Sequence, residues 1–374
     1  MGSIPTVSTS SHQPTEEART AFRILAIDGG GIRGLIPALV LQDLEARVPG
    51  QLADYFHLIV GTSTGGLIAL GLTAPGEQPG VARLDATKLV ALYRERGPEI
   101  FRRSLWQRLR TVGGWLGPKY SSTALARVVH EELGEAPLSA ALRDVIAVAY
   151  GMTSRDTRFF KRWRAVEDPT RDVKVVDAAL ATASAPTYFP SHEVGGDALV
   201  DGGVFAANPT VAGIVEALKR HDAPVPVSPK DLFVVSLGTG TREASYPQRK
   251  VAHWGRLGWI WPSGGGPPLI GAMLDGQSDA AHHWAHMLMN HDPGDELPAE
   301  LGRGPRYFRL DPPLPQPIAL DDAGPAELEA MSTAAAGMIA ERRADLDEVA
   351  SVLTRAGPLS QATPPAGSAE GAAD

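Results

Sequence analysis

Residues 56–72 of this 374-residue chain read FHLIVGTSTGGLIALGL, which is an apolar run, a glycine-rich turn and a second apolar run. The first run predicts a strand over Phe56–Val60, and the second predicts that a helix begins within Leu67–Leu72. The turn at residues 61–65 fits the pattern G-x-S-x-G. A strand that passes through a tight turn into a helix indicates an α/β fold with a mostly parallel sheet.

Ser63 lies at the centre of this turn. A nucleophile on a sharp strand-to-helix turn has a strained backbone and an exposed hydroxyl, and Gly61 and Gly65 would let strand and helix pass closely. The helix would also direct its positive N-terminal end toward a developing oxyanion. The alternative is a Ser- and Gly-rich turn that matches a loose pattern by chance, and the apolar flanks favour a catalytic role.

A second glycine-rich turn, DGGGIRG at residues 28–34, follows a strand expected over Phe22–Ile27 and precedes a helix expected over Leu35–Arg47. We interpret it as an oxyanion hole, because consecutive glycines can direct backbone N–H groups at one point. Arg33 would add a cation for the oxyanion or for a substrate phosphate. The residues expected to supply the N–H groups are Gly29, Gly30 and Gly31.

Other interpretations of this turn remain open. Gly29, Gly31 and Gly34 also satisfy the dinucleotide-binding pattern G-x-G-x-x-G, but the acidic residue at the required spacing, Asp54, precedes the second strand instead of ending it. A phosphate-binding P-loop is excluded because no Gly-Lys-Ser/Thr follows. The turn can also serve helix–strand packing alone.

A base for Ser63 is harder to find. None of the ten histidines lies in a glycine-flanked loop after a strand, and His192 is the best of them. The motif Asp201-Gly202-Gly203 follows a short apolar run, so a carboxylate would lie on an uncrowded loop and accept the serine proton directly. Alone, Asp-Gly-Gly is also an ordinary turn sequence.

The other histidines give no metal site. His57 is expected inside the strand before Ser63, and His282 and His286 share a helical face without a carboxylate to complete a site. The chain has no cysteine, which excludes thiol nucleophiles, disulfides and thiolate metal sites. The histidines and the absence of cysteine therefore argue against a metal site.

Charge and hydropathy exclude further classes. The net charge of −8 argues against binding a nucleic-acid polymer, and no run approaches the roughly 18 apolar residues of a membrane span. The polar N-terminus has no signal-peptide core. These features predict a cytoplasmic protein that reaches the inner membrane surface only peripherally when active.

The expected organisation is one α/β domain over residues 21–325, with helices on both faces of the sheet. Residues 1–20 are expected to form a flexible arm and 358–374 a disordered tail. Residues 241–272, rich in Gly, Pro and Trp, predict a loop or lid, and residues 326–357 predict C-terminal helices. The remaining expected elements are strands at 145–150 and 232–237 and helices at 175–183, 211–219 and 280–290.

Together, the motifs at 28–34, 61–65 and 201–203 resemble, in order and spacing, the signatures of patatin-like phospholipases. The segments ASAPTYFP (183–190) and SLGTG (236–240) are similar to that family as well. The resemblance implies an α/β/α fold and a Ser-Asp dyad, with Ser63 as nucleophile, Asp201 as base and the glycine loop with Arg33 as oxyanion hole. It also implies that the chain needs no metal and no cofactor. Its implied substrate is a membrane phospholipid or another acyl ester.

The segments 274–278 (LDGQS) and 306–322 resemble a bacterial subgroup that includes anti-phage effectors switched on by a cyclic nucleotide. Residues 94–119 carry seven Lys or Arg and two Glu, a net +5, interleaved with aromatic residues. This stretch is either a solvated helix face or a surface for anionic lipid or a phosphate-bearing ligand. An oligomer, a constitutive lipase or esterase, a catalytically silent lipid- or nucleotide-binding module and a dinucleotide-dependent oxidoreductase remain alternatives.

Overall fold

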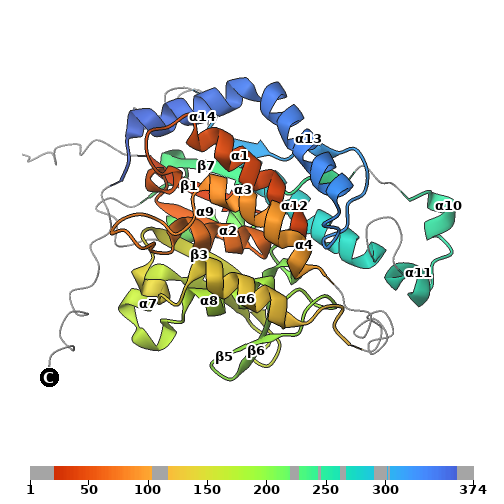
Figure 1. The fold of residues 1–374 in the computed structure, drawn as a ribbon. Helices are drawn as coiled ribbons and strands as arrows, with labels where there is room; N and C mark the ends of the chain where they lie inside the picture. Colours follow the sequence, from red (N-terminus) through yellow and green to blue (C-terminus); the bar gives the residue numbers. More distant parts are fainter. Residues whose placement is uncertain are drawn as a thin grey trace, which may run out of the picture.

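The computed structural model describes residues 21–102, 117–219, 227–242, 246–261, 267–289, 301 and 304–359 (Figure 1). Within them, an eight-stranded sheet has the order β5-β6-β3-β2-β1-β7-β9, and β4 pairs with β3. The strands are β1 (Phe22–Ile27), β2 (Leu58–Thr62), β3 (Asp144–Gly151), β4 (Thr157–Lys161), β5 (His192–Val194), β6 (Asp197–Asp201), β7 (Leu232–Leu237) and β9 (Tyr307–Leu310).

The centre of this sheet is parallel, and one side of it is antiparallel. Strands β3, β2, β1, β7 and β9 run in the same direction, whereas β4 and β6 run antiparallel to β3, and β5 runs antiparallel to β6. The expected mostly parallel α/β sheet is confirmed. The apolar run before Asp201 indicated β6, but β4 and β5 and the antiparallel direction were not anticipated, because β4 and β5 are short and carry few apolar residues.

Helices cover both faces of the sheet, and the side chains of its central strands are therefore buried on both sides. Leu25 and Ile27 face one core, and Ile24 and Ala26 face the other. The helices of the first core include α1 (Leu35–Glu45), α2 (Thr64–Thr73), α3 (Ala86–Ala91), α6 (Ser122–Leu133), α7 (Arg162–Glu167), α8 (Val175–Ala183), α13 (Pro325–Glu341) and α14 (Arg343–Ala356). The helices of the second are α9 (Thr210–Leu218) and α12 (Pro268–Met289).

Several sequence-based expectations match the structure closely. The strands β1 and β7 and the helix α8 have the bounds that the apolar patterns predicted. The helix after the serine begins earlier than expected, at Thr64 and not within Leu67–Leu72, because its first turn contains two glycines that carry no apolar signal. The expectation for His57 was wrong: this residue precedes β2, stacks on Phe22 and accepts the backbone N–H of Arg23 at 3.0 Å.

The pairing of β3 brings two distant parts of the chain together. Strand β4 pairs with Ile146–Tyr150 on one edge of β3, so β2 and β6 must share the opposite edge. On that edge Thr62 lies opposite Val148, and Asp201 lies opposite Ala149. The carboxyl ends of β2 and β6 therefore meet, and the turn with the predicted nucleophile follows β2 directly.

The predicted loop or lid at 241–272 is partly helical. It contains β8 (Thr241–Arg242), which pairs with β10 (Pro313–Leu314), and the short helices α10 (Gln248–Val251) and α11 (Arg256–Ile260), which project from the body beside α12 (Figure 1). The predicted arm at 1–20 and all but two residues of the predicted tail lie outside the described residues. No helix in the described ranges is both long and apolar enough to span a bilayer.

Candidate active site

The turn at Ser63 has a strained backbone and is closely packed. Ser63 has φ 56° and ψ −123°, a conformation that residues with a side chain rarely adopt. A Cβ on Gly61 would lie 2.1 Å from the carbonyl oxygen of Gly65, and a Cβ on Gly65 would lie 2.1 Å from that of Ile27. Both positions therefore require glycine, as the sequence pattern predicted.

Hydrogen bonds from a neighbouring helix hold this turn in place. The backbone N–H of Ser63 donates to Thr182 Oγ1 at 2.9 Å, and the Thr182 hydroxyl donates to the carbonyl oxygen of Val148 at 2.5 Å. Thr182 lies on α8, whose partner strand β3 also pairs with β6. Ser63 and the carboxyl end of β6 are therefore both anchored to β3.

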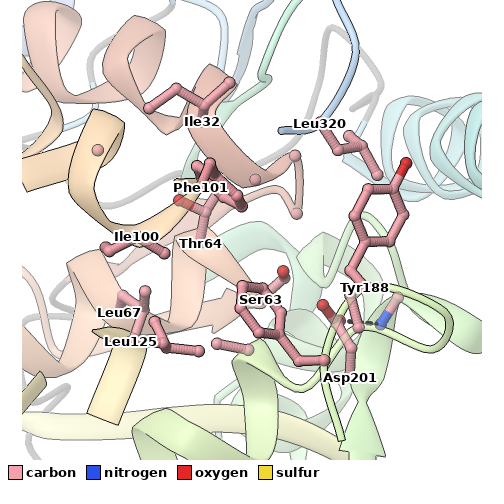
Figure 2. Close-up of a pocket in the computed structure, with 18 of the residues that line it drawn as sticks. Ile32, Ser63, Thr64, Leu67, Ile100, Phe101, Leu125, Tyr188, Asp201 and Leu320 are labelled. Carbon is pink, nitrogen blue, oxygen red and sulfur yellow. Dashed lines mark hydrogen bonds between the residues drawn. The ribbon is translucent and has the colours of Figure 1, made fainter. Parts of the chain in front are cut away.

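Asp201 ends β6 beside Ser63 (Figure 2). Its Oδ1 accepts the backbone N–H of Gly203 at 2.7 Å, and its own N–H donates to the carbonyl oxygen of Ser184 at 3.0 Å. The Ser63 side chain lies near enough to this carboxyl group to lower its pKa. A Cβ on Gly202 would lie 2.4 Å from the carbonyl oxygen of Val148, so the loop can approach β3 only with glycine there.

Burial changes the acidity of Asp201. Desolvation raises the pKa of its carboxyl to about 6, although hydrogen bonds from Ser63 and from the Gly203 N–H oppose the shift. The carboxylate form, which accepts a proton, therefore predominates only above about pH 6. A general base with a pKa near neutrality is well matched to proton transfer at physiological pH.

The glycine loop packs directly on the turn with the serine. A Cβ on Gly29 would lie 3.2 Å from the Cβ of Ser63, and Gly31 has φ +59° with the carbonyl oxygen of Leu320 2.1 Å from where its Cβ would be. The N–H of Gly29 is taken by the carbonyl oxygen of Ala207 at 2.8 Å. In the described part of the chain, the amides of Gly30 and Gly31 have no hydrogen-bond acceptor.

Arg33 does not line the cavity at Ser63. It is buried, and its guanidinium donates to the carbonyl oxygen of Gly240 at 3.2 Å. Gly34 allows the loop to pack closely against the start of α2, because a Cβ at this position would lie 2.3 Å from Thr64 Oγ1. The expected glycines of the loop therefore gather at the serine, whereas the expected cation points into the neighbouring loop.

A buried ionic cluster under the glycine loop was not found from the sequence. Arg309 on β9 donates to both carboxylate oxygens of Asp28, at 3.0 and 2.6 Å, and to Asp311 at 2.6 Å. Ser278 on α12 donates to Asp28 Oδ2 at 3.1 Å, and Arg309 also donates to Ser236 at 2.9 Å. Desolvation raises the pKa of Asp28 to about 6, and Arg309 opposes this. The cluster joins α12, β7 and β9 to the residue that precedes the first loop glycine.

A cavity of about 250 Å³ opens at Ser63 and Asp201 (Figure 2). Its wall is almost entirely apolar, and its polar side chains are few. The apolar groups include Leu67, Ile100, Phe101, Leu125, Phe189, Met273, Leu274 and Leu320. Such a wall suits a hydrocarbon chain and does not suit a charged headgroup.

The predicted basic stretch at 94–119 is only partly described. Arg96 pairs with Glu99 at 2.9 Å, and Lys119 pairs with Asp321. These two cations are therefore occupied within the protein. Residues 103–116, with most of the aromatic groups of the stretch, lie outside the described residues.

No histidine replaces Asp201 as the partner of Ser63 in the described structure. His192 lies 3.0 Å from Asp177, and His282 contacts the hydroxyl of Tyr307 at 2.9 Å. The described residues contain no group of three His, Cys, Asp or Glu side chains suited to a metal ion.

Comparison with known proteins identifies the family. The model of the "Patatin-like phospholipase" family matches residues 25–214. Patatin-like protein 2 of Arabidopsis thaliana is 35% identical over 68% of this chain and 69% of its own length. Patatin-like protein 1 of Arabidopsis thaliana is 33% identical over 77% and 73%, and Patatin-1-Kuras 2 of Solanum tuberosum is 35% identical over 63% and 68%.

A solved structure, VipD from Legionella pneumophila, aligns with a TM-score of 0.37 at 10% identity over 86% of this chain and 67% of its own, which is too distant for any conclusion. The family match covers the glycine loop, the serine turn and the Asp-Gly-Gly loop. On that basis, the chain belongs to the patatin-like phospholipase family and is a hydrolase of lipid acyl esters.

Proposed function

We propose that this chain cleaves fatty acyl esters of membrane phospholipids through a dyad of Ser63 and Asp201. The observation that carries the proposal is the meeting of the ends of β2 and β6 on one edge of β3, because it brings a strained serine beside a buried carboxyl group. Neither residue alone suffices for the chemistry. A serine hydroxyl needs a base to become a nucleophile, and the Asp201 carboxylate is the base available.

The reaction then has two steps. Asp201 takes the Ser63 proton as Oγ attacks the ester carbonyl, and the alkoxide leaving group takes that proton when the tetrahedral intermediate collapses. Asp201 next deprotonates a water molecule, which attacks the acyl-enzyme, releases the fatty acid and restores Ser63. The apolar cavity would hold the acyl chain during both steps.

The oxyanion would be stabilised by backbone amides. Among the three loop glycines Gly29, Gly30 and Gly31, the N–H groups of Gly30 and Gly31 are the donors that the described structure leaves available, and α2 begins directly after Ser63 with its positive end toward the site. Arg33 would act indirectly, through its contact with Gly240. Of the three loop amides expected in the oxyanion hole, those of Gly30 and Gly31 remain as donors. Arg33 becomes a positioning residue and no longer a direct contact of the oxyanion.

The test is hydrolysis of defined phospholipids, followed by mass spectrometry of the released fatty acids. We expect Ser63→Ala and Asp201→Asn to reduce kcat/KM by about 10⁴-fold or more, as removal of a nucleophile or its base does in serine hydrolases. Thr62→Ser, next to the nucleophile but outside the cavity, is the matched control. Wild-type activity in either dyad variant would contradict the proposal.

Activation by a cyclic nucleotide is a finer hypothesis, which rests on the resemblance of residues 274–278 and 306–322 to a bacterial subgroup. The contacts of Ser278 and Arg309 with Asp28 offer another reason for these residues, because they support the glycine loop. A constitutive hydrolase is therefore the simpler proposal. Repeating the assay with a panel of cyclic nucleotides separates the two, since activation needs a rise in rate with one of them.

A further inference from the structure

An exposed apolar face lies on α11. Leu257 is 66% exposed, Ile260 is 41% exposed and Trp261 is 58% exposed. Leu257 and Ile260 are spaced i and i+3, so they share one side of the helix, and Trp261 directly follows the last helical residue. A contiguous group of large apolar side chains on an exposed surface is typical of an interaction site.

The other side of α11 is already occupied by an aromatic cluster. The rings of Trp254 and Trp259 lie 5.2 Å apart, and those of Trp254 and Tyr246 lie 4.9 Å apart, each edge to face. A Cβ on Gly258 would lie 2.7 Å from the ring of Trp254, so glycine allows the close contact. The cluster fixes α11 on the preceding segment, and the side chains of Leu257 and Ile260 remain exposed beside it.

The segment that carries this face is positively charged. Between Tyr246 and Trp261 the sequence carries Arg249, Lys250 and Arg256 and no acidic residue, whereas the whole chain has a net charge of −8. All three cations are exposed. Cations beside an exposed apolar face complement a lipid surface, which carries anionic headgroups above an apolar interior.

The face also lies next to the entrance of the cavity at Ser63. Helix α11 packs against α12 (Figure 1), and Ile270, Met273 and Leu274 of α12 line the cavity. Met273 is 50% exposed, as well as lining the cavity, and Leu269 one turn before it is 41% exposed. The exposed apolar side chains of α11 and of α12 therefore lie on two helices that pack together at the cavity wall.

We propose that the α11 face, defined as Leu257, Ile260 and Trp261 with Arg249, Lys250 and Arg256, docks the protein on an anionic phospholipid bilayer. The side chains of the face enter the interface between headgroups and acyl chains, and the cations contact lipid phosphates. Docking presents the cavity to the membrane, so that an acyl chain moves from the bilayer to Ser63 without crossing water. This inference rests on the proposed phospholipid hydrolase.

The experiment compares two double variants of the full chain in vesicle sedimentation and in hydrolysis assays. Leu257→Glu/Ile260→Glu changes the α11 face, and neither residue lines the cavity. The matched control is Met152→Glu/Val166→Glu, whose side chains are 47% and 40% exposed. Val166 lies on α7 (Arg162–Glu167), on the opposite side of the molecule from α11 (Figure 1). Vesicles contain phosphatidylcholine alone or phosphatidylcholine with phosphatidylglycerol, and a soluble short-chain ester reports the chemistry separately.

We expect the α11 double variant to lose at least about tenfold in affinity for the anionic vesicles and in their hydrolysis. Cleavage of the soluble ester should stay at the wild-type rate, and the control should match wild type in every assay. Replacing Arg249 or Arg256 by Gln should weaken binding about fivefold each, and added salt should reduce the difference. Wild-type binding by the α11 double variant would overturn the proposal.

Two further outcomes distinguish membrane docking from self-association, and docking from the chemistry at Ser63. If wild type is a dimer in light scattering, the α11 double variant is a monomer and neither binds vesicles, the face joins two copies of the chain and the docking proposal is wrong. Ser63→Ala should bind vesicles as wild type does. If wild type binds through this face but hydrolyses no ester, docking stands and the proposed function fails.

Discussion

Ser63 and Asp201 reach the same site by different means. The position of Ser63 is set locally, by a strained turn between β2 and α2 and by glycines four residues apart. The position of Asp201 is set by pairing between strands that are distant in the sequence, since β6 lies on β3 where β2 ends. The position of Ser63 is therefore determined by five consecutive residues, and the position of Asp201 by the topology of the sheet.

This difference implies that the two positions respond to different changes. The serine turn should fail when its close backbone contacts are disturbed. Asp201 should respond mainly to pH, because its buried carboxyl group has a raised pKa. The glycine loop between them depends on a third element, the ionic cluster around Asp28.

The largest effect should come from Gly61→Ala, which breaks the turn itself. The new Cβ would lie 2.1 Å from the carbonyl oxygen of Gly65, and backbone on both sides would have to move. We expect the free energy of unfolding to fall by about 4 kcal/mol or more and hydrolysis to be lost. Chemical denaturation measures the change. Gly276→Ala on α12, where nothing lies within 4 Å, is the control and should be neutral or slightly stabilising.

Arg309→Met should come next, because it leaves the buried carboxyl of Asp28 without its cation. Removing one partner of a buried pair costs about 3–5 kcal/mol, and the pKa of Asp28 should rise above about 6. Arg309→Lys should keep the fold and still lose roughly 10- to 100-fold in kcat, since a lysine cannot make the two parallel hydrogen bonds to Asp28 that hold the glycine loop. Arg171→Met, in an exposed pair with Asp168, should change stability by less than about 0.5 kcal/mol.

Equal kcat in wild type and Arg309→Lys would show that the cluster supports the fold without positioning the glycine loop.

Asp201→Asn should increase stability, and only at higher pH. The folded-state pKa of about 6 exceeds the ordinary 3.8, so the wild-type fold loses stability as pH rises through this window and the group ionises. Asn does not ionise, and we expect it to gain up to about 3 kcal/mol near pH 7 and nothing near pH 4. Thermal unfolding across this range measures the gain.

Asp197→Asn, at the other end of β6, is the control with the opposite sign. Hydrogen bonds from Ser154 lower the pKa of Asp197, so its ionised form favours the fold and its replacement should lose stability as pH rises. A gain for Asp201→Asn that did not depend on pH would contradict the assigned cause.

Ser63→Gly should give the smallest change in stability. Glycine adopts φ 56° and ψ −123° without strain, and we expect a gain of about 1 kcal/mol with complete loss of hydrolysis. Arg155→Gly, at φ 58° in an exposed turn, should gain a similar amount and keep full activity. Lower stability in Ser63→Gly would mean that the serine side chain helps to hold the turn.

The sequence predicted the parts of the site that are local. The apolar runs around the two glycine-rich turns predicted β1, α1, β2 and α2, and the Asp-Gly-Gly motif pointed to Asp201. What it could not predict depends on tertiary contacts. The edge shared by β2 and β6 on β3, the direction of the Arg33 side chain and the pairing of Arg309 with Asp28 arise from segments that are far apart along the chain.

The most direct test of the central claim is the rate at which a fluorophosphonate probe labels the chain, with the modified peptide identified by mass spectrometry. We predict a single adduct on Ser63 in wild type, formed faster as pH rises through about 6. In Asp201→Asn, labelling of the same serine should be at least about 10³-fold slower. An adduct on another serine, or equal rates in the two proteins, would contradict a Ser63–Asp201 dyad.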